Sequence, residues 1–182
     1  MKNTSLKLTE IARKTLEAAL KGEKFQPDKE TKKKYSKKQA CFVTLTEKST
    51  GDLRGCIGSL LPRQELWKDV QENAINAAFS DYRFSPLEKN ELNKVKIEVS
   101  ILSIPKSLKY KDEKDLLSKL NPKLGLILKK GFSSATFLPQ VWEQLPDKIE
   151  FLENLAQKAG LNKNDWKTAS FEFYTVEKEE EN

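Results

Sequence analysis

One six-residue stretch, Leu53-Arg54-Gly55-Cys56-Ile57-Gly58, limits the possible folds of this chain more than any other segment. It follows a turn-forming segment, 48–52, and a strand-forming segment, 41–45, so it reads as the second strand of a hairpin. Leu53, Gly55 and Ile57 would then share one face of the strand, and the other three residues the opposite face. Two glycines weaken a strand unless a backbone or a ligand approaches closely there. The stretch therefore predicts a strand with a close neighbour, and it places a cation two residues from a thiol.

The chain contains no histidine and only two cysteines. This composition excludes a Ser-His-Asp triad, a Cys-His pair, every histidine-based metal site and a zinc site of four thiolates within the chain. Acid–base chemistry would have to use Asp, Glu, Lys, Tyr or Cys. No cofactor is predicted. No apolar run approaches the ~18 residues of a membrane span, and no signal-peptide core is visible, so we expect a cytoplasmic protein without a membrane partner.

The net charge of +6 is concentrated at the N-terminal end, where residues 1–38 hold twelve Lys/Arg and five Asp/Glu. Such a segment has two interpretations. It is either a surface that binds nucleic acid or an acidic partner protein, or a lysine-rich face that is simply exposed to solvent. The lysines at 32–34 and 37–38 are interleaved only with Tyr35 and include no arginine. Nucleic-acid binding is therefore expected to be weak and nonspecific at most.

Hydrophobic periodicity predicts an α+β chain whose organisation changes at Pro105. The expected helices cover residues 8–20, 62–80, 112–120, 139–145 and 148–159. The expected strands cover residues 41–45, 53–58, 94–104, 125–129, 134–138 and 170–176. The charged tail 177–181 is expected to fray.

This order predicts one domain, residues 1–182, built from two lobes. The larger lobe, 1–104 with 168–182, would hold an antiparallel sheet with flanking helices and would take 170–176 as an edge strand. The smaller lobe, 105–167, would be an inserted α+β unit around the 125–138 hairpin. Two linking segments would allow the lobes to move relative to each other.

Six blocks, in order over roughly residues 6–176, resemble the AMMECR domain family. They comprise the hexapeptide, Cys41-Phe42-Val43-Thr44-Leu45, Asn73-Ala74 together with the run from Ala77 to Leu87, Ile97-Glu98-Val99-Ser100-Ile101-Leu102, Phe137-Leu138-Pro139-Gln140-Val141-Trp142 and Lys158-Ala159-Gly160-Leu161. The resemblance implies a two-lobe fold with the hexapeptide facing the cleft between the lobes. It also implies association with Memo-type and radical-SAM proteins, as one component of a modification system.

The sharpest catalytic candidate is Cys56, with Arg54 and Glu98 as supporting groups. A cysteine nucleophile reacts as the thiolate, which a nearby cation such as Arg54 stabilises. The alternative is that Cys56 is a small buried apolar residue. Arg54 either binds an anionic ligand or forms a structural ion pair, with Glu98 as its expected partner.

The remaining candidates would line a cleft for a substrate or partner. Asp81 and Arg83 either frame the mouth of this cleft or form an ion pair that caps their loop. Trp142 either lines the small-lobe side with Gln140 or packs in the core. The full predicted cleft consists of Leu53, Arg54, Gly55, Cys56, Ile57, Gly58, Asp81, Arg83, Gln140 and Trp142.

These features leave open whether the chain is an enzyme. The first hypothesis is an enzyme component that acts on a ligand or protein segment through Arg54, Cys56 and Glu98. The second is a non-catalytic adaptor for a Memo-type or radical-SAM partner. The third is weak nucleic-acid binding through the basic N-terminal segment.

Overall fold

The structure, a computed structural model, describes residues 5–181. The chain forms two compact units: the first runs up to Leu102 and resumes at Glu177, and the second is Ser103–Val176. Each unit has its own four-stranded sheet and its own hydrophobic core. The predicted α+β class is confirmed.

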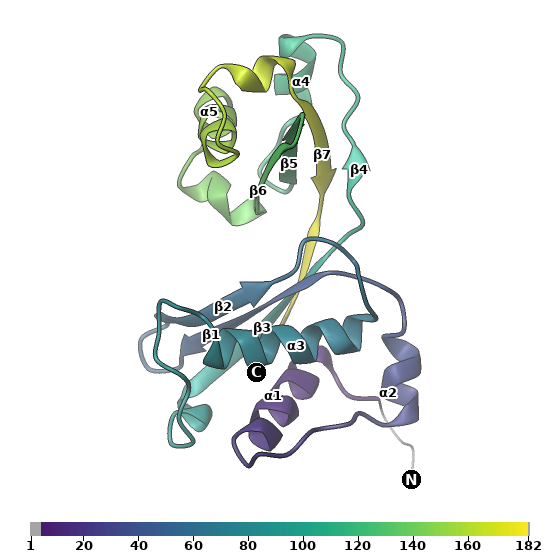
Figure 1. Ribbon diagram of the computed structural model, residues 1–182, viewed down its shortest axis with the longest axis vertical. Helices are drawn as coiled ribbons and strands as arrows, with labels where there is room; N and C mark the ends of the chain where they lie inside the picture. The colour runs from purple at the N-terminus through teal and green to yellow at the C-terminus, as the bar shows by residue number, and fades with distance from the viewer. Residues whose placement is uncertain (1–4, 182) are drawn as a thin grey trace. The chain divides into compact units, whose positions relative to one another are not determined.

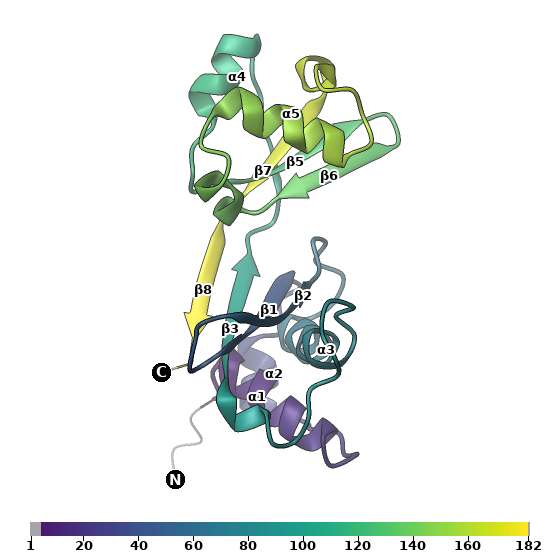
Figure 2. The same ribbon diagram turned by 90° about the vertical axis from the view of Figure 1, so that its left-hand side faces the viewer.

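The first unit begins with helices and ends with a strand from the C-terminal segment. Its elements are α1 (Leu8–Ala19), α2 (Lys29–Lys34), β1 (Cys41–Glu47), β2 (Leu53–Gly58), α3 (Leu66–Phe79), the 3-10 turn η1 (Leu92–Lys94), β3 (Val95–Leu102) and β8 (Val176–Glu180). The strands lie in the order β2-β1-β3-β8, and β1 is antiparallel to both of its neighbours. Figures 1 and 2 show α1 and α3 on the same side of this sheet.

Burial alternates along β1 because one face of the sheet meets the helices. Cys41, Val43 and Leu45 are fully buried, whereas Phe42 and Thr44 between them are only partly covered. Small buried alanines in α3 allow this helix to lie close to the strands. The core therefore fills the space between the sheet and the pair α1 and α3, and the opposite sheet face carries more polar residues.

The register of β2 contains an irregularity at Arg54. Leu45 pairs with Gly55, but the next residue, Thr46, pairs with Leu53, so Arg54 is an extra residue in the strand. The predicted alternation of faces is thus correct from Gly55 to Gly58 but wrong for Leu53, because the bulge shifts the pattern by one residue.

The second unit consists of short strands and helices around the 125–137 hairpin. Its elements are β4 (Lys106–Ser107), α4 (Glu113–Lys119), β5 (Gly125–Lys130), β6 (Ser133–Phe137), η2 (Pro139–Glu143), α5 (Lys148–Lys158), η3 (Asp165–Thr168) and β7 (Ser170–Tyr174). The sheet order is β4-β7-β5-β6, and α5 lies over the β5–β6 hairpin (Figure 2). Residues of α4, α5 and η3 supply much of the apolar core beside this sheet.

The predicted place of β7 in the first unit is wrong. β7 pairs with β4 and β5, so it is an interior strand of the second sheet and not an edge strand of the first. Phe171 and Tyr174 of β7 are buried. The second unit therefore extends to Val176, beyond the predicted boundary at residue 167.

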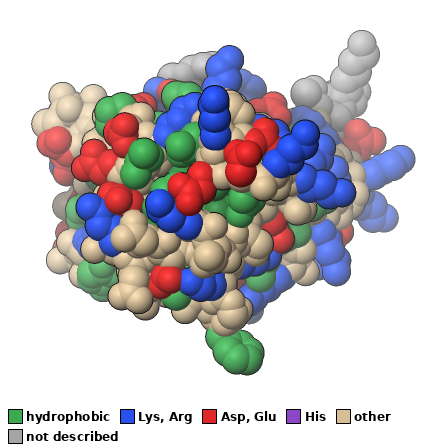
Figure 3. All heavy atoms as spheres, turned by 90° about the horizontal axis from the view of Figure 1, so that it is seen from above, with side chains coloured by type: hydrophobic (Ala, Val, Ile, Leu, Met, Phe, Trp, Pro, Cys, Tyr) green, Lys and Arg blue, Asp and Glu red, His purple; other side chains and the backbone are tan. Residues whose placement is uncertain are grey.

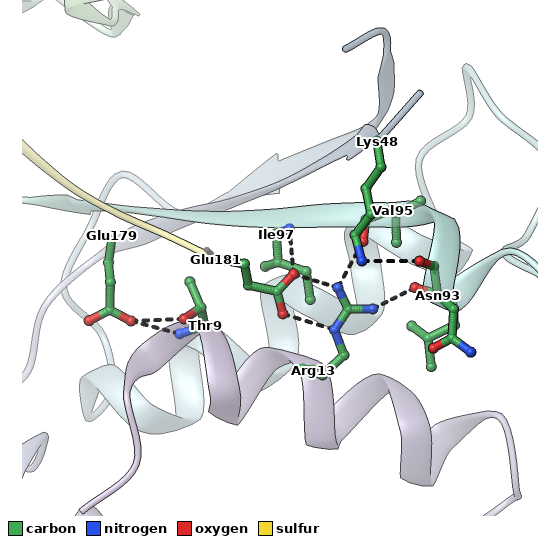
Figure 4. A network of polar contacts seen from close by, with 9 residues as sticks. Thr9, Arg13, Lys48, Asn93, Val95, Ile97, Glu179 and Glu181 are labelled. Carbon is green, nitrogen blue, oxygen red and sulfur yellow. Dashed lines mark hydrogen bonds and ion pairs between the residues drawn. The ribbon is translucent and has the colours of Figure 1, made fainter. Parts of the chain in front are cut away.

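The C-terminal segment is also ordered, although its composition predicted fraying. Glu179 accepts hydrogen bonds from the Thr9 amide at 2.9 Å and the Thr9 hydroxyl at 3.2 Å, at the N-terminal turn of α1. The Glu181 carboxylate binds the Arg13 guanidinium and accepts from the Ile97 amide at 3.0 Å (Figure 4). These contacts are made 84 or more residues apart in the chain, so local strand propensity does not reveal them.

Candidate functional site

The hexapeptide forms β2, which lies at the edge of the sheet and, within residues 5–181, pairs only with β1. Cys56 lies opposite Thr44, which in turn lies opposite Glu98 on β3. Because paired residues point to the same face of a sheet, these three side chains form a row on the face away from α1 and α3.

Arg54 forms its ion pair with Glu91 and not with Glu98. Its Nε and Nη2 donate to the two oxygens of Glu91 at 3.0 and 3.1 Å, and Nη2 also donates to the Ser85 carbonyl at 3.0 Å. The Arg54 guanidinium beside Glu91 lowers the pKa of that carboxyl. The predicted partner, Glu98, instead binds Lys178 at 3.2 Å and the Ser100 hydroxyl at 2.9 Å. The expectation was wrong because the bulge at Arg54 breaks the regular alternation of the strand.

Asp81 and Arg83 together hold the outer edge of β2. The Asp81 carboxylate accepts from the Cys56 amide at 2.9 Å and from the Arg83 Nη2 at 2.7 Å, while Arg83 Nη2 donates to the Cys56 carbonyl at 3.3 Å. The Asp81 side chain is almost fully buried, and its hydrogen bonds from Arg83 hold the pKa of the carboxyl far below its ordinary value. The loop thus satisfies backbone groups that an edge strand otherwise leaves free.

The Cys56 thiol is half-buried and has one side-chain hydrogen-bond partner in the described part of the chain, the Thr44 hydroxyl at 3.3 Å from Sγ. Glu98 lies two strands away, a separation of roughly 10 Å across a sheet. Arg83, not Arg54, supplies the cation that touches the Cys56 backbone. The predicted trio of Cys56, Arg54 and Glu98 is therefore not one cluster.

Cys41, by contrast, is a core residue. It is fully buried between the sheet and the helices, and burial raises the pKa of its thiol well above the ordinary value. Its amide donates to the Asp69 carboxylate at 2.9 Å, and its carbonyl accepts from the Asn73 amide at 3.1 Å. Cys41 is therefore a structural residue.

Both glycines of the hexapeptide have close neighbours, as the sequence predicted. A Cβ atom on Gly55 would lie 2.2 Å from the carbonyl oxygen of Ala77 in α3. A Cβ atom on Gly58 would lie 2.2 Å from the ring of Phe42 on the adjacent strand. The absence of a side chain at Gly55 therefore leaves room for the backbone of α3, and its absence at Gly58 leaves room for the Phe42 ring.

Gln140 and Trp142 belong to the second unit, on η2. Trp142 is buried, stacks on Phe151 with a centroid distance of 3.7 Å, and donates from Nε1 to the Leu124 carbonyl at 3.0 Å. Core packing thus accounts for Trp142. The role of these two residues in lining a site stays a prediction.

Three residues of this region were not among the predicted site residues. Glu91 is one of two acidic residues in the stretch 88–91, and nothing local marks it as the partner of Arg54. The Phe84 ring lies 5.8 Å from the Arg54 guanidinium carbon and 5.5 Å from that of Arg83. Tyr82 is 94% exposed, between two residues that the loop fixes in place.

The basic N-terminal segment forms a surface, separate from β2 in sequence, around α2. Lys33, Lys34, Lys37 and Lys38 are exposed. Figure 3 shows lysine and arginine side chains gathered on the right-hand side, where Figure 1 places α2. Lys32 and Lys68 also lie over the Trp67 ring, at 5.0 and 5.2 Å from its centroid.

The described residues contain neither a cluster of metal-ligating side chains nor a helix that could span a membrane. Across residues 5–181, no three Cys, Asp or Glu side chains converge to form a metal site. The helices of the described chain are also too short or too polar to cross a membrane.

Comparison with known proteins identifies the family. The AMMECR1 family model matches residues 9–180. The chain belongs to the AMMECR1 family. A Nanoarchaeum equitans relative is 38% identical over 174 residues, covering 94% of this chain and 96% of its own length. A Methanosarcina barkeri relative is 41% identical over 162 residues, covering 86% of this chain and 79% of its own.

A solved structure extends this similarity to the fold. The crystal structure of the uncharacterised protein PH0010 from Pyrococcus horikoshii matches with a TM-score of 0.82 and 34% identity. The match covers 96% of this chain and 89% of that one. The resemblance carried by the hexapeptide and the other five blocks is therefore confirmed at the level of family and fold.

Proposed function

We propose that this AMMECR1-family protein is a binding component that holds a partner protein at the β2 edge and the loop 81–86. The observation that carries the proposal is that the charged side chains around Cys56 serve the strand itself. Asp81 and Arg83 hold the Cys56 backbone, and Arg54 is bound to Glu91. They act as positioning groups and leave few free groups for acid–base chemistry.

The loop 81–86 supports the proposal because it presents one aromatic side chain from a rigid frame. The Phe84 amide donates to the Asp81 carbonyl at 3.0 Å, and the Ser85 carbonyl accepts from buried Arg54. Tyr82 lies between these anchored residues and is 94% exposed. Tyrosine is among the residue types that dominate binding energy at protein interfaces, and a fixed loop loses little conformational entropy on binding.

The proposed partners are Memo-type and radical-SAM proteins, the association that the family resemblance implies. The test mixes the purified chain with a purified Memo-type protein and, separately, a purified radical-SAM protein, and measures affinity by calorimetry. Tyr82→Ala should weaken binding by about 30-fold, the effect of losing a hot-spot residue of about 2 kcal/mol.

Phe132 provides the matched control, because it is also a fully exposed aromatic but lies in the β5–β6 turn of the second unit. Phe132→Ala should leave the affinity unchanged. No binding to either protein, or equal loss in both variants, would contradict the proposal.

A second candidate, a thiol-dependent enzyme component, is favoured by the partly exposed Cys56 beside the Arg83 guanidinium. Iodoacetamide labelling followed by mass spectrometry distinguishes the two functions, since buried Cys41 is protected in the folded chain. Rapid labelling of Cys56 that persists at pH 6 and is lost in Arg83→Gln would favour the enzyme. Labelling that is slow at pH 6 and insensitive to Arg83→Gln would favour the binding component.

A further inference from the structure

A cavity of about 440 Å³ lies within the first unit, beside the start of β2. Arg54 and Glu91 line it together with Glu47, Lys48 and Ser49 of the β1–β2 turn and Lys94 of η1. Its volume falls in the range of pockets that hold small molecules. Every lining residue belongs to the first unit, so the cavity is complete within that unit.

Arg54 is the buried cation of this cavity. It is 8% exposed, whereas Lys48 and Lys94 are exposed and form the rim. Glu91 occupies its Nε and Nη2, but its buried Nη1 has no hydrogen-bond partner within residues 5–181. A buried guanidinium donor without an acceptor is costly to a folded chain, and its presence calls for an explanation.

The charges around the cavity favour an anion. The carboxylate of Glu91 is committed to Arg54 and to the Glu88 amide, which donates to it at 2.7 Å. The Arg54–Glu91 pair has no net charge. The other charged side chains that line the cavity are the two cations Lys48 and Lys94 and the anion Glu47. The cavity thus carries a net positive charge, and an arriving oxyanion would find two ammonium groups at the rim.

The wall of the cavity is fixed by long-range contacts. Arg13 donates to the carbonyls of Leu92 and Val95, and Glu181 holds Arg13 in that position (Figure 4). Lys48 donates from Nζ to the Asn93 carbonyl at 3.0 Å. These bonds hold the segment 92–95 against α1 and the β1–β2 turn, so the cavity is pre-formed and binding requires little ordering.

We propose that this cavity is a binding site for a small oxyanion, a compound with a carboxylate or phosphate group. The anion would bind to Lys94 and Lys48 and complete the hydrogen bonding of Arg54. This inference goes beyond the proposed function, because it assigns Arg54 of the hexapeptide to a small-molecule site apart from Tyr82 and the Cys56 row.

The test is an NMR titration of the full chain with inorganic phosphate and, separately, with acetate, both at constant ionic strength maintained with sodium chloride. Saturable amide shifts should appear in residues 47–49, 54 and 91–95. Lys94→Ala should weaken the apparent affinity at least five-fold, and Lys48→Ala should have a similar effect. Shifts with phosphate alone would assign the site to phosphate compounds, and shifts with both probes would assign it to oxyanions generally.

Lys33→Ala is the matched control, because Lys33 is an exposed lysine of α2 in the same unit. It should leave the titration unchanged. Two results would overturn the proposal: no saturable shift around the cavity with either anion, or shifts that survive in Lys94→Ala and disappear in Lys33→Ala. The second result would show that the anions bind the basic surface around α2.

Discussion

Gly55→Ala tests the central packing contact of the hexapeptide. The added Cβ would lie 2.2 Å from the Ala77 carbonyl oxygen and 3.1 Å from its carbonyl carbon. Real Cβ atoms essentially never approach a heavy atom closer than 3.0 Å, so either β2 or α3 has to move by most of an ångström. The atom in the way is backbone, and no side-chain rotation relieves the contact.

The magnitude follows from two opposing effects. Overpacking a well-packed core costs about 1–3 kcal/mol. Replacing glycine by alanine recovers about 0.4–1 kcal/mol through the unfolded state where the backbone conformation allows it. Gly55 does not have a positive φ, so this gain applies. Because α3 is buried through Val70, Ala74 and Ala78, its movement disturbs the core, and we expect a cost near the upper end of this range. After the gain is subtracted, the expected net loss is about 2 kcal/mol.

Thermal unfolding measures this loss as a fall in Tm of about 4–8 °C for a chain of this length. Two double variants isolate the cause. Ala77→Gly should not rescue Gly55→Ala, because the oxygen remains. Phe42→Ala should offset part of the loss in Gly58→Ala, because there the three atoms nearest to the Cβ all belong to the Phe42 ring. A Gly55→Ala protein that melts at or above the wild-type temperature would refute the close approach of α3.

Three further predictions concern charged groups. Asp81→Asn should cost about 1.5–3 kcal/mol near neutral pH in chemical unfolding, through lost charge-assisted hydrogen bonds. Because the folded-state pKa of Asp81 is lowered, its stabilisation should be present at neutral pH and lost as the pH falls below about 4. Wild type and Asp81→Asn with parallel acid-unfolding curves would contradict this. Glu181→Gln should speed hydrogen exchange of the Ile97 amide, because the partly buried pair with Arg13 holds the C-terminal strand; unchanged exchange would argue against that role. Replacing lysines 32–34 with alanine should abolish any RNA binding seen in a mobility-shift assay, and tight, salt-insensitive binding would contradict a phosphate-contact mechanism.

Much of the fold is visible in the sequence because its signals are local. The alternation through Cys41, Val43 and Leu45 predicts a strand with one buried face, and the glycines at 55 and 58 predict close neighbours. The periodic patterns of α1, α3 and β3 predict the elements that cover and continue this sheet. Each signal depends on which side of an element is apolar, and that is set within a few residues.

The ion-pair partner of a charged residue and the neighbour of a strand are not determined by nearby residues. Nothing near Arg54 distinguishes Glu91 from Glu98, and a bulge of one residue decides between them. The alternating pattern of β7 identifies a strand but not the sheet it joins, so the predicted lobe boundary was misplaced. The tail is too charged to form a strand by propensity alone.

The AMMECR1-type α+β fold, its two hairpins and the need for space at Gly55 can all be predicted from the amino-acid sequence. The folded chain was needed to show that Ala77 fills this space, that Asp81 and Arg83 hold the Cys56 backbone, and that Glu179 and Glu181 anchor the C-terminal strand. The physical reason is that burial patterns repeat along a segment and can be counted. An ion pair or a strand pairing instead depends on two distant segments meeting at one register, which the rest of the fold selects.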